Sequence, residues 1–91
     1  MSATTINNLI EILIQSVADC LGGEYNLTSD DVPRIIFTTE DGTNKISVVY
    51  LASSNQWKAF YPFPAAVQSK EYFKNIRELI EWLYSKGVTV L

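Results

Sequence analysis

The chain has 91 residues, 47% of them apolar, and seven Lys and Arg against ten Asp and Glu give it a net charge of −3. This length fits one domain, residues 1–91, and the apolar fraction is typical of a folded protein. The acidic balance disfavours proteins that bind nucleic acid or an anionic membrane through a basic stripe. The chain contains no histidine, which excludes Ser/His and Cys/His nucleophile pairs and imidazole metal sites.

The N-terminal segment predicts neither a signal peptide nor a membrane span. It has no basic start, and Asn7, Asn8, Glu11 and Gln15 interrupt its apolar residues. We therefore expect a cytoplasmic protein with no membrane contact.

Residues 5–21 predict an amphipathic helix, because apolar residues recur there at helical spacing. The Gly22-Gly23 pair is typical of a helix end. Ile12 falls on the polar side of this helix, and we expect it at the surface. Cys20 lies in the last turn of the apolar face, where a buried, unreactive thiol is expected. As the single cysteine, it can form no intrachain disulfide.

Three β-rich runs predict an antiparallel meander over residues 34–40, 45–52 and 56–63. The Asp-Gly pair at 41–42 favours a two-residue type I′ turn between the first two runs. Residues 24–33, which combine short polar side chains, paired acids and a proline, predict a loop before the sheet.

The two-residue loop predicts the register of the first hairpin, with Phe37 opposite Ile46 and Ile35 opposite Val48. Side-chain alternation then divides the three strands between two faces. One face is well filled and is the expected core, with the second helix packed on it: Ile35, Phe37, Ile46, Val48, Tyr50, Trp57, Ala59, Tyr61 and Phe63.

The second face combines apolar with polar residues: Ile36, Val49, Leu51 and Phe60 with Thr38, Lys45, Ser47 and Lys58. A wet face of an antiparallel sheet is expected to be more polar than this. Two explanations stay open. Either the first helix covers this face as a third layer, or both helices pack on the core face. In the second case an apolar patch rimmed by Arg34, Lys45 and Lys58 remains, and such a patch marks an interface.

A second helix is predicted near the C-terminus, with an apolar face formed by Tyr72, Phe73, Ile76, Leu79, Ile80, Leu83 and Tyr84. Ser69 and Asn75 are alternative N-caps, the latter with Glu78 in capping-box spacing. Trp82 lies outside this stripe and is a candidate for contact with a partner. Residues 88–91 predict a short terminal strand. The predicted fold is α+β, in the order α-β-β-β-α-β.

The helix–strand–strand–strand–helix order is similar to that of the double-stranded-RNA-binding domain. The resemblance implies that RNA phosphates dock at a lysine-rich start of the second helix. Lys70 and Lys74 occupy that region here, but Glu71 and Glu78 offset them, which departs from the pattern of that family.

Three hypotheses for the function follow. The first is a non-enzymatic protein-interaction or adaptor domain that binds another protein or a second copy of itself as a homodimer. Its candidate contact residues are Ile36, Val49, Leu51, Phe60 and Trp82. The second is a nucleic-acid-binding domain that uses Lys45, Lys58, Lys70 and Lys74. The third is a small carboxylate-based enzyme or ligand-binding domain. The residue pattern nominates no catalytic, metal or cofactor site.

Overall fold

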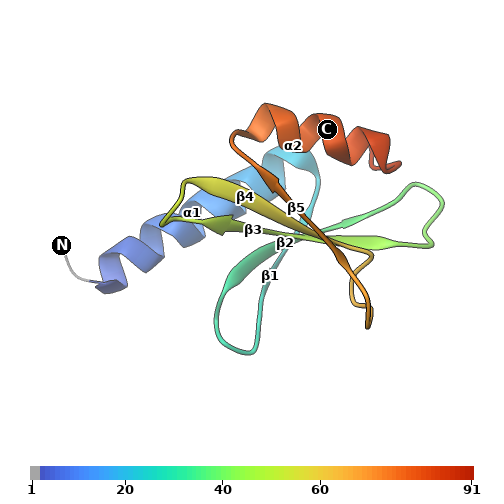
Figure 1. Ribbon diagram of the computed structural model, residues 1–91. Coiled ribbons are helices and arrows are strands. Elements are labelled where there is room, and N and C mark those ends of the chain that lie inside the picture. The colour runs from blue at the N-terminus through green and yellow to red at the C-terminus, as the bar shows by residue number, and fades with distance from the viewer. Residues whose placement is uncertain (1–2) are drawn as a thin grey trace.

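The computed structural model describes the backbone of residues 3–91 and the side chains from residue 9 onward. These described residues form seven elements in succession (Figure 1). They are α1 (Ala3–Leu21), β1 (Glu24–Leu27), β2 (Pro33–Thr38), β3 (Lys45–Leu51), β4 (Gln56–Tyr61), β5 (Ser69–Phe73) and α2 (Ile76–Ser85). Within the described residues, neither helix combines the length and the apolar character needed to cross a membrane.

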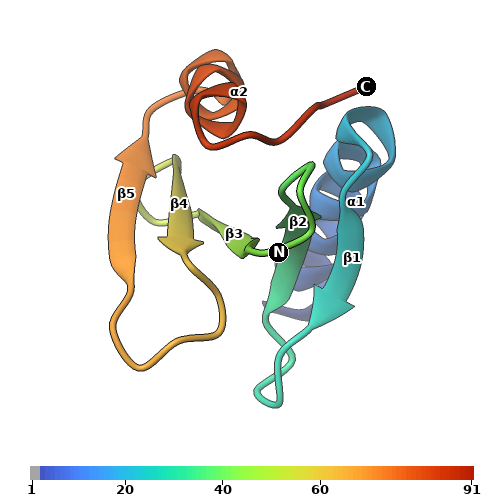
Figure 2. The same cartoon turned by 90° about the vertical axis from the view of Figure 1, so that its right-hand side faces the viewer.

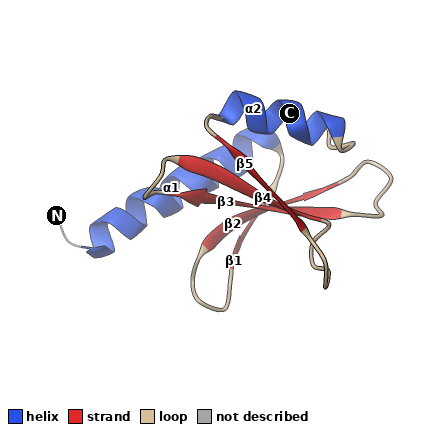
Figure 3. Ribbon diagram, in the orientation of Figure 1, coloured by secondary structure: helices blue, strands red, loops and turns tan. Residues whose placement is uncertain are grey.

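The five strands form one antiparallel sheet in chain order (Figure 3). The α+β class is therefore confirmed, but the predicted order α-β-β-β-α-β is wrong, because the chain follows α-β-β-β-β-β-α. Strand β1 forms where we expected a loop, and β5 forms where we expected the second helix to begin. Residues 88–91, expected as a strand, are not part of the sheet. Val88 and Val90 nevertheless lie in the core.

The first hairpin has the predicted register, with Phe37 opposite Ile46 and Ile35 opposite Val48. Its turn is wider than predicted. Thr39 N donates to Asn44 O at 3.0 Å, so four residues lie between this pair. Within the turn Gly42 has a φ of +74°, while Asp41 keeps a negative φ, so the turn is not type I′. The register is as predicted because the observed loop adds one residue on each side of the predicted two-residue Asp41-Gly42 loop.

Both helices pack on the same face of the sheet. Helix α1 contacts β1, β2 and β3, and α2 contacts β5 (Figure 2). Their buried side chains join one hydrophobic cluster with the predicted core face of the strands. The cluster contains Ile14, Ala18 and Leu21 from α1, Leu79 and Leu83 from α2, and Ile35, Phe37, Ile46, Val48, Trp57, Ala59 and Phe73 from the sheet. The explanation in which α1 covers the second face is therefore wrong.

Helix α1 buries a narrower stripe than its sequence predicts. Leu9 and Leu13 are exposed, because the N-terminal half of α1 projects past the sheet (Figure 1). Ile12 is exposed as predicted. Cys20, expected in the core, is exposed, and Ala18 packs in the core at that end of the helix instead.

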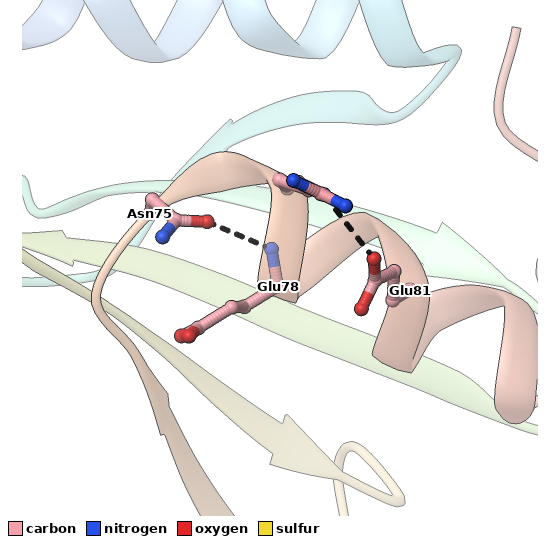
Figure 4. A network of polar contacts seen from close by, with 4 residues as sticks. Asn75, Glu78 and Glu81 are labelled. Carbon is pink, nitrogen blue, oxygen red and sulfur yellow. Dashed lines mark hydrogen bonds and ion pairs between the residues drawn. The ribbon is translucent and has the colours of Figure 1, made fainter.

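Helix α2 begins at the second of the two predicted caps. Asn75 has an extended backbone, and its Oδ1 accepts a hydrogen bond from Glu78 N at 2.9 Å (Figure 4). Glu78 Oε2 in turn accepts from Lys74 N at 3.1 Å. The side chains of Asn75 and Glu78 thus satisfy two backbone N–H groups at the start of the helix. Ser69 is the first residue of β5 and caps no helix.

Candidate functional site

Among the described elements, no helix covers the second face of the sheet, which we call the open face. Its members follow from strand alternation and pairing register. They are Glu24 and Asn26 on β1, Arg34, Ile36 and Thr38 on β2, Lys45, Ser47, Val49 and Leu51 on β3, Gln56, Lys58 and Phe60 on β4, and Lys70 and Tyr72 on β5.

Four of the five sequence-predicted contact residues lie together on the open face. Ile36 pairs with Ser47, and Ser47 pairs with Phe60, so these three side chains form one row across the sheet. Val49 and Leu51 lie further along β3. Ile36, Val49, Leu51 and Phe60 are each half-buried, and they place apolar surface within reach of solvent.

Trp82, the fifth predicted contact residue, lies on the helix-covered side of the sheet. Its ring packs edge-on against Tyr61 with the centroids 6.2 Å apart, and 5.4 Å from the ring of Phe73. Trp82 is half-buried and packs against the core. The sequence pattern missed this because it extended the helix face to Tyr72 and Phe73, which belong to β5.

The open face concentrates positive charge. Each of four adjacent strands contributes one cation: Arg34, Lys45, Lys58 and Lys70. These are four of the seven Lys and Arg in an acidic chain, whereas Glu24 is the one acid among the strand residues of this face. The sequence predicted the first three as a rim. It missed the position of Lys70 because β5 resembles the start of a helix.

Aromatic rings and cations are interleaved on this face. Lys58 Nζ lies 5.0 Å from the ring centroid of Phe60 and 5.3 Å from that of Tyr72. The Arg34 guanidinium carbon lies 4.9 Å from the ring centroid of Phe63. Such contacts hold a cation in place over a ring. Phe63 was predicted on the core face, but β4 ends at Tyr61, and Phe63 follows in the connection to β5.

A groove of about 340 Å³ runs along the open face. The β1–β2 connection, the sheet and the β4–β5 connection all contribute to its lining. Both connections lie at the end of the molecule opposite α2 (Figure 2). The lining residues are Thr28, Asp30, Val32, Arg34, Ser47, Val49, Phe60, Phe63 and Gln68. Among them Ser47 is only 2% exposed and Arg34 carries the positive charge. The sequence could not reveal the groove, because it depends on how the two connections fold.

Arg34 contains an unpaired hydrogen-bond donor. Its Nε atom is buried and has no hydrogen-bond partner among the described residues. A buried donor without a partner typically costs about 1–3 kcal/mol, so such groups are rare in proteins and their positions are informative. The guanidinium beside Phe63 is therefore oriented but incompletely satisfied.

A larger cavity of about 520 Å³ lies on the other side of the β1–β2 connection, where it meets α1. It is lined in part by Glu11, Asp30 and Asp31. Glu11 Oε1 accepts a hydrogen bond from the Tyr25 hydroxyl at 2.9 Å. Burial, together with this bond, raises the pKa of Tyr25. Glu11 thus joins α1 to β1. Among the described side chains, no three carboxylate or thiol groups are grouped closely enough to hold a metal ion.

The open face offers half-buried apolar side chains, cations supported by aromatic rings, and a guanidinium with an unused N–H. These groups are suited to non-covalent recognition of a partner surface. Comparison of the chain with protein-family models, with curated proteins and with solved structures finds no match.

Proposed function

We propose that this protein is a non-enzymatic interaction domain that binds a protein partner through the open face. The observation that supports this proposal is that α1 and α2 pack on one face of the sheet and leave the other without a helix. A sheet face that is only wetted by solvent is expected to be polar. This one instead presents Ile36, Val49, Leu51 and Phe60 between cations.

The composition of the open face supports a docking role. Interfaces are enriched in aromatic residues and arginine, and their energetic centres are apolar groups surrounded by polar ones. Phe60, Phe63, Tyr72 and Arg34 lie together here. An apolar patch of this kind, rimmed by charge, is a typical feature of a protein-binding surface.

Two matched double variants test the proposal. Val49→Asp with Phe60→Ser changes the open face, and Leu9→Ser with Ile12→Asp changes exposed apolar residues of α1. Circular dichroism and thermal unfolding establish that both variants fold. We expect proteins captured by the unchanged chain to be captured by the α1 variant and lost from the open-face variant. Binding of each purified partner is then measured by calorimetry. Capture that is equal for all three chains would contradict the proposal.

A nucleic-acid-binding domain is the second candidate function. The observation that favours it is that Lys45, Lys58 and Lys70 share one face with Phe60 and Tyr72, since single strands bind to basic grooves with stacking rings. The candidate predicts RNA or DNA binding that weakens steeply with salt. Absence of RNA or DNA binding at low salt would rule out this candidate function.

A further inference from the structure

We propose that the occupant of the open face is an acidic, partly apolar segment of a partner protein, which places one carboxylate on the Arg34 guanidinium. This inference rests on the proposed function and specifies the chemistry of the partner. Its starting point is the buried Arg34 Nε, which has no hydrogen-bond partner among the described residues.

The geometry of Arg34 suits a carboxylate. A guanidinium presents its N–H groups in a planar fork, and a carboxylate accepts two of them in parallel. Phe63 supports the guanidinium from one side at 4.9 Å, so less side-chain entropy is lost on binding. Because Nε itself is buried, a carboxylate in the groove meets the part of the guanidinium that lines it, and it reaches Nε only if the groups that cover this nitrogen move.

The spacing of the cations favours several separate carboxylates over one dense anion. Arg34 precedes Ile35, which pairs with Val48, and Val49 pairs with Lys58. Arg34 and Lys58 therefore lie in one row, two strands apart, at roughly 10 Å in the backbone. Lys70 lies in the neighbouring row, opposite Phe60, and adds a further cation on β5. A segment that follows the row of Arg34 meets Arg34 and Lys58 with Val49 between them, and Val49 accepts an aliphatic side chain.

Charge complementarity also disfavours two other occupants. A second copy of this chain, paired face to face about a two-fold axis, would bring four cations against four like charges. The bases of a nucleic acid would stack on ring faces, but the rings of Phe60, Phe63 and Tyr72 already have a cation over one face. An acidic peptide uses the same cations without requiring a free ring face.

The groove carries a negative charge from Asp30 as well as the positive charge of Arg34. It lines the groove from the β1–β2 connection, whereas Arg34 is on β2. A carboxylate in the groove is attracted by Arg34 and repelled by Asp30. Neutralising these two side chains should therefore change the binding of one acidic peptide in opposite directions.

The test is a selection from a library of random twelve-residue peptides on the unchanged full chain, with counter-selection on the Val49→Asp/Phe60→Ser variant. We expect the recovered peptides to be enriched in Asp and Glu and to contain at least one large apolar residue. For a synthesised recovered peptide, we expect Arg34→Gln to weaken binding about tenfold or more and Asp30→Asn to strengthen it. Replacing the acids of that peptide by Gln and Asn should remove the effect of Arg34→Gln.

The outcomes separate this inference from the proposed function. Recovery of neutral or basic peptides that still require the open face would overturn the acidic partner and leave the interaction role standing. Failure to recover any peptide that requires the open face would overturn both. Tight, salt-dependent binding of a single-stranded oligonucleotide would overturn the inference in favour of a nucleic acid. A homodimer abolished by Val49→Asp/Phe60→Ser would overturn it in favour of a second copy.

Discussion

The carboxylate of Asp41 organises the connection between β2 and β3. Its Oδ1 accepts hydrogen bonds from the Thr39 hydroxyl at 2.6 Å, the Thr43 hydroxyl at 2.8 Å and Thr43 N at 3.0 Å. The bond from Thr39, followed by those from Thr43, lowers the pKa of Asp41 from 3.8 to about 2. The ionised form of Asp41 is therefore more stable in the folded chain than in the unfolded one.

This pKa predicts a specific loss of stability in acid. Because the folded-state pKa is depressed, the contribution of Asp41 is complete above about pH 4 and is lost as the pH falls through about 2. We expect Asp41→Asn to be less stable than the unchanged chain at pH 7, and the difference to shrink between pH 4 and pH 2. Urea unfolding across this range measures it. In Thr39→Val, the Asp41 carboxyl should titrate closer to 3.8 by NMR. A difference that does not vary with pH would refute the prediction.

Gly23 is required by a close approach between the end of α1 and the sheet. A Cβ atom at this position would overlap Cγ2 of Ile35 and lie 2.9 Å from Cε1 of Phe37. Both neighbours are fully buried core side chains, so neither has room to move.

We expect Gly23→Ala to destabilise the fold by about 1–3 kcal/mol, the usual range for overpacking. Gly42→Ala is the matched control. Its Cβ meets no atom within 4 Å, but the φ of +74° is unfavourable, at a cost of about 1–2 kcal/mol. Urea unfolding compares the two variants. The cause should show in the NMR spectrum, where Gly23→Ala shifts the methyl signals of Ile35 and Gly42→Ala does not. Unchanged Ile35 signals in Gly23→Ala would rule out the steric explanation.

At the scale of elements, α2 is a ten-residue helix and depends on its cap. We expect Asn75→Ala to destabilise the protein by about 1 kcal/mol, because Glu78 N loses its acceptor. Arg77→Gln, which removes an exposed ion pair with Glu81 at 3.4 Å, should change stability by less than about 0.5 kcal/mol. Thermal unfolding of the two variants gives both values. Equal losses of stability in the two variants would show that the Asn75 cap contributes no more than the exposed ion pair.

The strands that the sequence predicts are those with strong alternation. β2 and β4 alternate buried with more exposed residues, whereas β3 buries residues 46–48 in succession, and its faces follow from its register with β2 and β4. The edge strands lack this signal. In β1, with the sequence EYNL, three of four residues are exposed, and in β5, with the sequence SKEYF, four of five are. Tyr72 and Phe73 also fit helical spacing with Ile76, so the sequence pattern predicted a helix where β5 lies.

The candidate site was predictable to the same extent. Ile36, Val49, Leu51 and Phe60 were placed on one face because strand alternation determines it. The groove was not predictable, because Phe63 and Gln68 reach it from an irregular connection. The sequence also did not predict which face of the sheet the helices cover. The apolar side of an amphipathic helix indicates that the helix packs on the sheet, but not on which face.

At the scale of the whole molecule, the domain has one core on one side of its sheet. We expect Ile14→Ala in α1 and Leu83→Ala in α2 each to cost about 2–5 kcal/mol, because both side chains are fully buried in that core. Val49→Thr on the open face should cost less than about 1 kcal/mol, since the side chain is half-exposed. Urea unfolding measures all three. A large loss of stability in Val49→Thr would indicate that the open face is part of the core.

The position of Trp82 has a practical consequence for spectroscopy. The chain contains two tryptophans, Trp57 and Trp82, and both lie on the helix-covered side of the sheet. Their emission therefore reports unfolding, while a partner that docks on the open face leaves their surroundings unchanged. Tyr72, exposed on the open face, is a suitable position for Tyr72→Trp. That replacement would give the protein an optical signal for docking, separate from the signal for folding.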